Sequence, residues 1–194
     1  MEWAVPIQKI DASKIQVGSL QKTAKPITSL SYSDGTFHFQ HLNILLPPLP
    51  VKEYDAITGK LILNLSEFKS TSQRLFSIQE TILNTVYQQQ KQWFSDSDRS
   101  PDQIQALFQP FVEGDLLHLY CPLQTQDKKY GLSLWKEGSW KKLTVPGLFQ
   151  KGDLLRVGLR LQGISFQMNV NTGSWTGRFR VQHRIFCMYH CNKS

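Results

Sequence analysis

The sequence has few cysteines and no long apolar run, and each shortage excludes a class of protein. Its 194 residues include three cysteines, Cys121, Cys187 and Cys191, which cannot all pair, so a disulfide-stabilised secreted fold is not expected. The longest apolar stretch, Ile44–Leu49, is broken by prolines and is far shorter than the roughly 20 residues that a membrane-spanning helix requires. The N-terminus shows no basic and apolar leader. We therefore expect no membrane association and a reducing, intracellular compartment.

Motifs that carry catalysis or hold cofactors are also missing. The sequence has no Gly-rich phosphate or dinucleotide loop, no Gly-x-Ser-x-Gly elbow and no His-Glu-x-x-His pair. His183, Cys187, His190 and Cys191 gather near the C-terminus, but residues four apart on a strand lie about 13 Å apart, too far to share one zinc ion. We therefore expect no enzyme activity, no metal site and no cofactor.

Acidic residues are scarce in one part of the chain. Overall, 22 Lys and Arg against 15 Asp and Glu give a net charge of +7. Residues 1–115 carry ten basic and twelve acidic side chains, whereas residues 116–194 carry twelve basic and three acidic ones. The excess of positive charge therefore belongs to the last 79 residues, and it favours a polyanionic partner such as nucleic acid.

Strand patterns occupy the first third of the chain. One or two short strands are expected in residues 1–25, and the Asp34-Gly35 pair predicts a hairpin within residues 27–46. The proline-rich segment 46–50 lacks ladder donors at three positions, so we expect it to leave the sheet, with pairing resumed at Lys60–Leu65.

The middle of the chain is helical. Apolar residues at helical spacing predict one long helix over Leu75–Phe94, with a capping box of Ser70 and Gln73 at its start. A second capping box within Ser100–Gln103, with a proline at the first helical position, predicts a short helix ending near Phe108.

The last third returns to a period-two pattern. Strands are expected at residues 116–121, 131–135, 154–166 and 176–189, with turns at 126–128, 137–138, 151–153 and 169–173. Strands on both sides of a helical section indicate one α+β domain with a mainly antiparallel sheet. We divide it into N-terminal strands (1–70), a helical insertion (71–110) and a basic C-terminal sheet (111–194).

The last two predicted strands have one apolar and one basic face. Strand parity places five arginines and two glutamines, and no acid, on the second face: Arg156, Arg160, Arg178, Arg180, Arg184, Gln162 and Gln182. A polar strand face can simply point to water and discourage aggregation. Like charges facing one another across a hairpin destabilise it, however, and a bound anion would neutralise them. Both interpretations are open.

Aromatic residues and lysines in the same region favour a nucleic-acid interpretation. A positive groove with flat rings is typical of single-strand binding, because cations follow the phosphates and bases stack on the rings. Each ring can equally pack in the core or across a hairpin. The candidate set beside the arginines is Lys141, Lys142, Trp135, Trp140, Trp175, Tyr120 and Phe166.

The order of elements resembles the single-stranded-DNA-binding proteins of phage T7 type and their relatives in large nucleocytoplasmic DNA viruses. The similarity lies in Phe37-His38-Phe39-Gln40 followed by Leu46-Pro47-Pro48, in the inserted helix Leu75–Phe94, and in the closing segments Gly152–Val157, Gly163–Phe166 and Gly177–Gln182. This resemblance implies an oligonucleotide-binding fold, a small Greek-key barrel. Phage members end in an acidic tail that recruits replication partners, whereas this sequence ends His190-Cys191-Asn192-Lys193-Ser194.

The leading hypothesis is a non-catalytic protein that binds single-stranded DNA in viral-type replication or repair. Its partners would be single-stranded nucleic acid, with DNA favoured, and replication proteins or further copies of itself. The resemblance would place it in the nucleus or at a viral replication site. The alternative is a virion or scaffold protein whose arginine face meets an acidic protein surface, and a nucleic-acid-processing enzyme is a third hypothesis.

Overall fold

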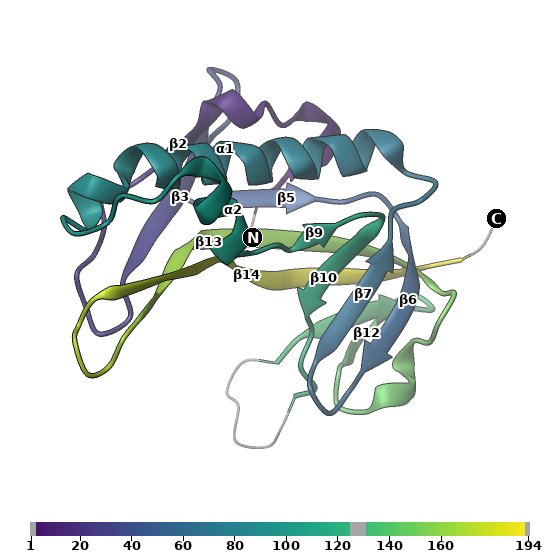
Figure 1. Cartoon of the computed structure of the whole chain (residues 1–194). Coiled ribbons are helices and arrows are strands. Elements are labelled where there is room, and N and C mark those ends of the chain that lie inside the picture. The colour runs from purple at the N-terminus through teal and green to yellow at the C-terminus, as the bar shows by residue number, and fades with distance from the viewer. Residues whose placement is uncertain (1–2, 125–130, 193–194) are drawn as a thin grey trace.

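Two long strands form the centre of the molecule. The structure, a computed structural model, describes residues 3–124 and 131–192; the turn expected at 126–128 lies outside them. β13 (Leu154–Met168) and β14 (Trp175–Cys191) pair antiparallel along their whole length. Figure 1 shows this hairpin running beneath the long helix, with its tip projecting to one side.

Twelve shorter strands in the described part of the chain extend the central hairpin into one connected sheet. Segments of β3, β5 and β6 pair with the outer edge of β13, and β8 and β11 pair with the outer edge of β14. The twelve strands are β1 (Val5–Pro6), β2 (Ile15–Val17), β3 (Ile27–Ser33), β4 (His38–Phe39), β5 (Leu42–Leu45), β6 (Leu49–Asp55), β7 (Lys60–Asn64), β8 (Phe108–Gln109), β9 (Val112–Glu113), β10 (Leu116–Tyr120), β11 (Ser133–Lys136) and β12 (Ser139–Lys142).

Most strand pairs are antiparallel, and the predicted α+β class is confirmed. Parallel pairing is restricted to β1 with β5, β11 with β14 and β8 with β14 among the described strands. The hairpin predicted at Asp34-Gly35 is present, because Tyr32 of β3 pairs with Phe39 of β4. Asp34 fixes that turn by accepting hydrogen bonds from the backbone N–H groups of Thr36 and Phe37.

The proline-rich segment does not leave the sheet for as long as predicted. β6 begins at Leu49, and Pro50 is paired with Leu154 of β13. Proline is tolerated at the beginning of a strand, where its missing N–H interrupts no continuous ladder. Pairing therefore resumes well before Lys60, where β7 begins.

Two helices cover one face of the sheet (Figure 1). α1 (Lys69–Trp93) buries an apolar stripe that includes Leu75, Ile78, Ile82 and Val86. It begins one residue before the predicted capping box: its N-cap is Phe68, which makes no side-chain cap hydrogen bond, so the prediction of a Ser70 cap was wrong.

The second helix is capped as predicted. α2 (Pro101–Leu107) has Ser100 as its N-cap, and both hydrogen bonds of the capping box with Gln103 are present. Three single-turn 3₁₀ helices complete the described structure: η1 (Ile7–Lys9), η2 (Ala12–Lys14) and η3 (Pro146–Leu148). No helix in the described ranges is long and apolar enough to cross a membrane.

A second set of strands packs against the part of the central hairpin that is distant from its tip. β6, β7, β10 and β9 lie in that order, beginning from the edge of β13. β10 then approaches β14, where the backbone N–H of Tyr120 donates to Nε2 of His183 over 3.1 Å. The apolar face of the hairpin is thus covered by helices at one end and by these strands at the other, which leaves the opposite face for a site.

Candidate functional site

Two β-bulges determine which side chains of the central hairpin share a face. In β13 the register shifts between Leu161 and Gly163, so Gln162 is the extra residue; in β14, Phe186 is extra between Ile185 and Cys187. A bulge reverses the alternation of side chains beyond it. Each strand therefore changes parity once, and the residues opposite the helix-covered side form what we call the basic face.

The five predicted arginines all belong to the basic face. Arg178, Arg180 and Arg184 are exposed, and Arg184 lies directly across the hairpin from Arg160. Arg160 and Arg156 are half-buried, and both are held by neighbouring strand β5 and the residue after it. Nε–H of Arg160 donates to Oδ1 of Asn43 over 3.0 Å, and Nε–H of Arg156 donates to the carbonyl of Leu46 over 3.2 Å.

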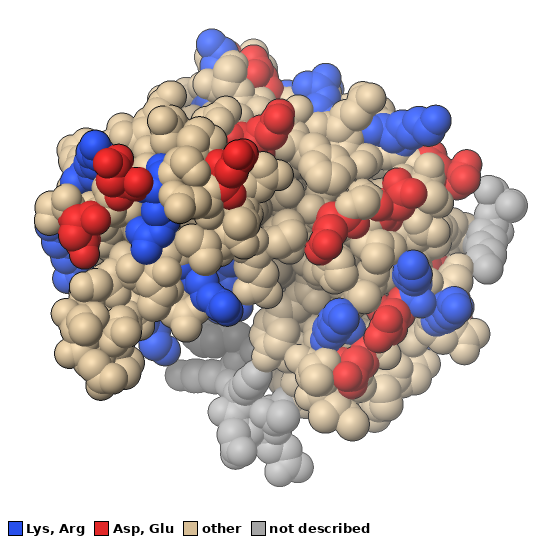
Figure 2. All heavy atoms as spheres, viewed as in Figure 1, with Lys and Arg blue, Asp and Glu red and all other residues tan. Residues whose placement is uncertain are grey.

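A cavity of about 760 Å³ opens beside the exposed arginines of the hairpin tip. Its polar lining comes from Lys25, Gln109, Ser165, Gln167, Arg178 and Arg180. Among the described residues, neither Arg178 nor Arg180 forms an ion pair. In Figure 2, basic side chains lie beneath α2 on the hairpin side, while the acidic side chains of this view lie over the helices and around the strands at the right. This end of the basic face is a cationic groove.

The opposite end of the basic face is aromatic. Arg156 pairs with Tyr189, Tyr189 with Trp135, and Trp135 with Trp140, so these four residues form one row across β13, β14, β11 and β12. The rings contact one another, with centroids 5.3 Å apart for Trp135 and Trp140 and 5.5 Å apart for Trp140 and Tyr189. Even so, Trp135 stays 37% and Trp140 51% exposed. Both interpretations of these rings hold together: they pack across strands and still offer surface.

The two predicted lysines, Lys141 and Lys142, lie on opposite faces of β12. Lys142 is exposed and shares the parity of Trp140 on β12, so it extends the aromatic row. Lys141 has the opposite parity, and its Nζ forms an ion pair with Oε2 of Glu137 over 3.2 Å. The structure thus brings Lys142 to the basic face and places Lys141 away from it.

Tyr120 lies away from the basic face, because its partner His183 shares the parity of the buried Val181 and Ile185 on the covered side of β14. It ends β10 and is 53% exposed, and its backbone N–H is the group that binds His183 on β14. Since Nε2 of His183 accepts this hydrogen bond, the imidazole is neutral. Burial, assisted by the positive charge of Arg180, lowers the pKa of His183 and favours this neutral form.

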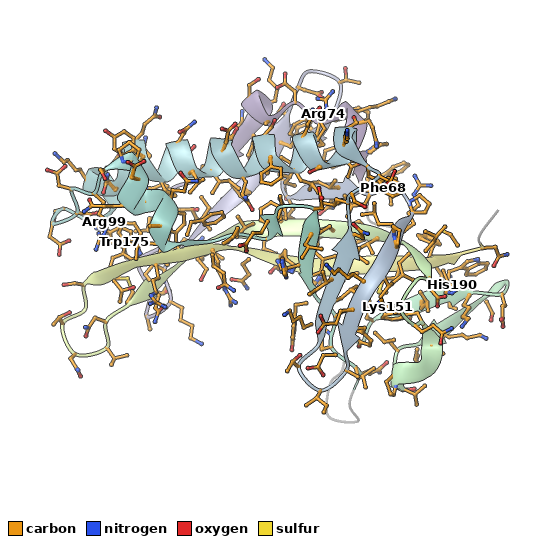
Figure 3. The ribbon with its side chains drawn as sticks, turned by 45° about the vertical axis from the view of Figure 1, so that its right-hand side comes forward. Phe68, Arg74, Arg99, Lys151, Trp175 and His190 are labelled. Carbon is orange, nitrogen blue, oxygen red and sulfur yellow. The ribbon has the colours of Figure 1, made fainter. Side chains whose placement is uncertain are left out.

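Trp175 and Phe166 were predicted at the binding surface, and the structure places both in the core. Trp175 is 5% and Phe166 3% exposed. The Trp175 ring stacks on Phe94 at 4.8 Å between centroids, and the guanidinium of Arg99 covers it at 4.7 Å (Figure 3). Its indole N–H donates to the carbonyl of Arg178 over 2.9 Å. Phe166 contributes to the lining of the cationic groove, but both rings are too buried to stack on a base.

Several residues at the site were not found from the sequence. Regular alternation from Phe179 would place Tyr189 on the apolar side; the bulge at Phe186 reverses this and brings Tyr189 to the basic face. Lys25, which lies just before β3, and Gln109 of β8 also line the groove. Both come near it only through tertiary contacts, such as the pairing of β8 with β14.

Thiols and histidines in the described ranges do not assemble into a metal site. No group of three or more His, Cys, Asp or Glu side chains there could hold an ion. Cys121 and Cys191 are not in disulfides, and burial raises the pKa of the Cys121 thiol to about 12. His190 is used otherwise, since its Nε2 lies 3.0 Å from Oδ2 of Asp153.

No protein-family model and no curated protein matches the sequence.

Proposed function

We propose that this protein binds single-stranded DNA, without catalysing a reaction on it, along the basic face of β13 and β14. The observation that carries the proposal is the combination, on one face, of a cationic groove and an exposed aromatic row. The groove is formed around Arg178 and Arg180, and the row includes Trp135 and Trp140.

The electrostatic part of the proposal concerns the repulsion between neighbouring arginines of β14. Arg178 and Arg180 point from one short stretch of β14 and make no ion pair among the described residues, while Arg184 follows four residues after Arg180. Closely spaced like charges repel one another, and a phosphate backbone would neutralise them with release of counterions. A polyanion is the partner that best suits this surface.

The aromatic part favours a single strand over a duplex. Bases of a duplex are stacked on one another, whereas those of a single strand are free to stack on Trp135, Trp140 and Tyr189. Such stacking contributes about 1–3 kcal/mol per base and depends little on sequence.

The proposal includes the finer fold suggested by the resemblance to phage T7-type proteins, an oligonucleotide-binding barrel. Supporting it, β13, β6, β7, β10 and β14 follow one another, and the Tyr120–His183 hydrogen bond joins the last two. The context would be viral-type replication or repair, as in the proteins that the sequence resembles.

The decisive experiment is a salt titration of oligonucleotide binding. The double variant Arg178→Ala/Arg180→Ala should weaken binding of a fluorescein-labelled oligothymidylate and of mixed sequences alike. It should also reduce the slope of log K against log salt by about 1.4, because each lost phosphate contact removes about 0.7. Fluorescence anisotropy at several salt concentrations measures both quantities.

A matched control removes the same charge elsewhere. Lys69→Ala/Lys91→Ala deletes two exposed cations of α1 on the helix side of the sheet and should leave the slope unchanged. Absence of salt-dependent binding by the wild-type protein would refute the proposal. A defined oligomer that ignores DNA would then favour the assembly protein, and strand cleavage with Mg²⁺ or Mn²⁺ would favour the processing enzyme.

A further inference from the structure

A second, smaller cavity of about 320 Å³ lies at the aromatic end of the basic face. Its lining is mostly apolar and comes from four distant parts of the chain: Trp3, Ala4, Leu45, Arg156, Phe186, Cys187 and Tyr189. The volume falls at the lower end of small-ligand sites, about 300–1,000 Å³, which suits one planar group and not a dinucleotide.

The bulge in β14 creates this cavity. With Phe186 as the extra residue, its ring lies over Gly158 of β13; a Cβ there would be 2.7 Å from Cζ of Phe186 and would overlap Sγ of Cys187. Only glycine leaves room for the ring. The same bulge brings Tyr189 to the face, so one irregularity supplies two aromatic walls.

The N-terminal segment supplies the third aromatic residue. Trp3 is 71% exposed, and its carbonyl accepts a hydrogen bond of 3.0 Å from Nδ2 of Asn43. That amide is tied to the basic face, because its Oδ1 accepts the hydrogen bond from Arg160. The segment is therefore anchored while the indole stays open to a ligand.

Arg156 is the one charged side chain among the lining residues, and a hydrogen bond to the backbone fixes its orientation. Its Nε–H is bound to the carbonyl of Leu46, and it has no other hydrogen bond or ion pair among the described residues. Its terminal nitrogens can therefore donate to a ligand, and a guanidinium has donors only. A ligand in this cavity must present acceptors along one edge of a flat ring.

We propose that this cavity binds a single nucleobase and favours guanine, which presents O6 and N7 as two acceptors on one edge. The inference rests on the proposed single-strand binding and adds a preference to it: one base of the bound strand enters between Trp3, Phe186 and Tyr189 and meets the Arg156 fork. Adenine presents a donor beside N7 and would leave one Arg156 donor opposite an N–H group.

The test compares oligothymidylates that carry one central guanine, adenine or cytosine with the all-thymine strand. Wild-type protein should bind the guanine strand about fivefold or more tightly than the others, in the range expected for a bidentate arginine contact. Arg156→Lys keeps the charge and loses the fork. It should bind all four strands with equal affinity, so that the ratio of guanine-strand to all-thymine affinity falls to about one.

Two controls make the result specific. Trp140→Ala should weaken binding of every strand and retain the guanine preference, and thermal unfolding verifies that Arg156→Lys is folded. Equal binding of all strands by wild type, with normal salt dependence, overturns the base site and leaves single-strand binding intact. A guanine preference that survives in Arg156→Lys overturns the assignment to this cavity. No binding of any strand means that the proposed function itself has failed.

Discussion

Trp175 and Trp140 belong to the same basic part of the chain, yet they have opposite surroundings. Trp175 contacts three other rings, those of Phe94, Phe166 and Phe179, whereas Trp140 is half exposed. Trp175→Ala should therefore cost about 3–5 kcal/mol of unfolding free energy, as for other large aromatic truncations in cores. Trp140→Ala should cost much less and instead weaken DNA binding. Urea unfolding followed by circular dichroism, with anisotropy titrations of both variants, separates the two effects.

The burial of Trp175 could not have been predicted from its own neighbourhood. A position just after a turn and before Thr176 usually suggests exposure. Its cover comes from Phe94 at the end of α1 and from Arg99 in the connection to α2. Arg99 passes directly over Gly177, where a Cβ would lie 2.6 Å from its Nε. Such long-range contacts leave no periodic pattern in the sequence.

Whole elements were more predictable than single side chains. The stripe of α1 and the alternation in β13 and β14 extend over many residues, so errors at single positions average out. Five arginines on one face followed from this alternation, even though Gln162 interrupts it. The bulge at Phe186 has no comparable sequence pattern. The position of Tyr189 on the basic face and the smaller cavity depend on this bulge, so neither could be predicted.

The contact between β10 and β14 depends on a neutral histidine and therefore on pH. Burial lowers the pKa of His183 in the folded protein below its unfolded value of about 6.5. The unfolded chain then binds the proton first, so folding stability is retained above about pH 6.5 and falls as pH decreases through the lowered pKa. The slope for one proton cannot exceed about 1.4 kcal/mol per pH unit.

The variant His183→Gln isolates this effect, because a glutamine carbonyl can still accept the hydrogen bond from Tyr120. We expect its unfolding free energy to change less than that of the wild type between about pH 7 and pH 5. Carboxylates such as Asp34, whose pKa is lowered by the backbone N–H of Phe37, lose their contribution only below about pH 4. Equal pH profiles for both proteins in the upper window would contradict the role of His183.

Across the whole molecule, the net charge of +7 is unevenly distributed, and part of it lies along one face of the hairpin. The cationic groove and the aromatic row lie at opposite ends of the basic face, with Ser165 near the first and Arg156 in the second. These two positions are nine residue steps apart along β13, which corresponds to about 30 Å. A bound strand would have to extend along the hairpin to use both ends.

This geometry predicts how affinity depends on oligonucleotide length. Short strands should reach one end only, and affinity for oligothymidylates should rise with length until both ends are occupied and then level off. Single-strand-binding barrels cover about 4–16 nucleotides, so the plateau should fall in that range. Quenching of the fluorescence of Trp135 and Trp140 should saturate at the same length, since these indoles stack only when the strand reaches their end. In Trp140→Ala the gain from the last nucleotides should shrink, whereas Arg178→Ala/Arg180→Ala should lower affinity at every length. A length series in which affinity levels off before quenching begins would show that the two ends do not act on one strand.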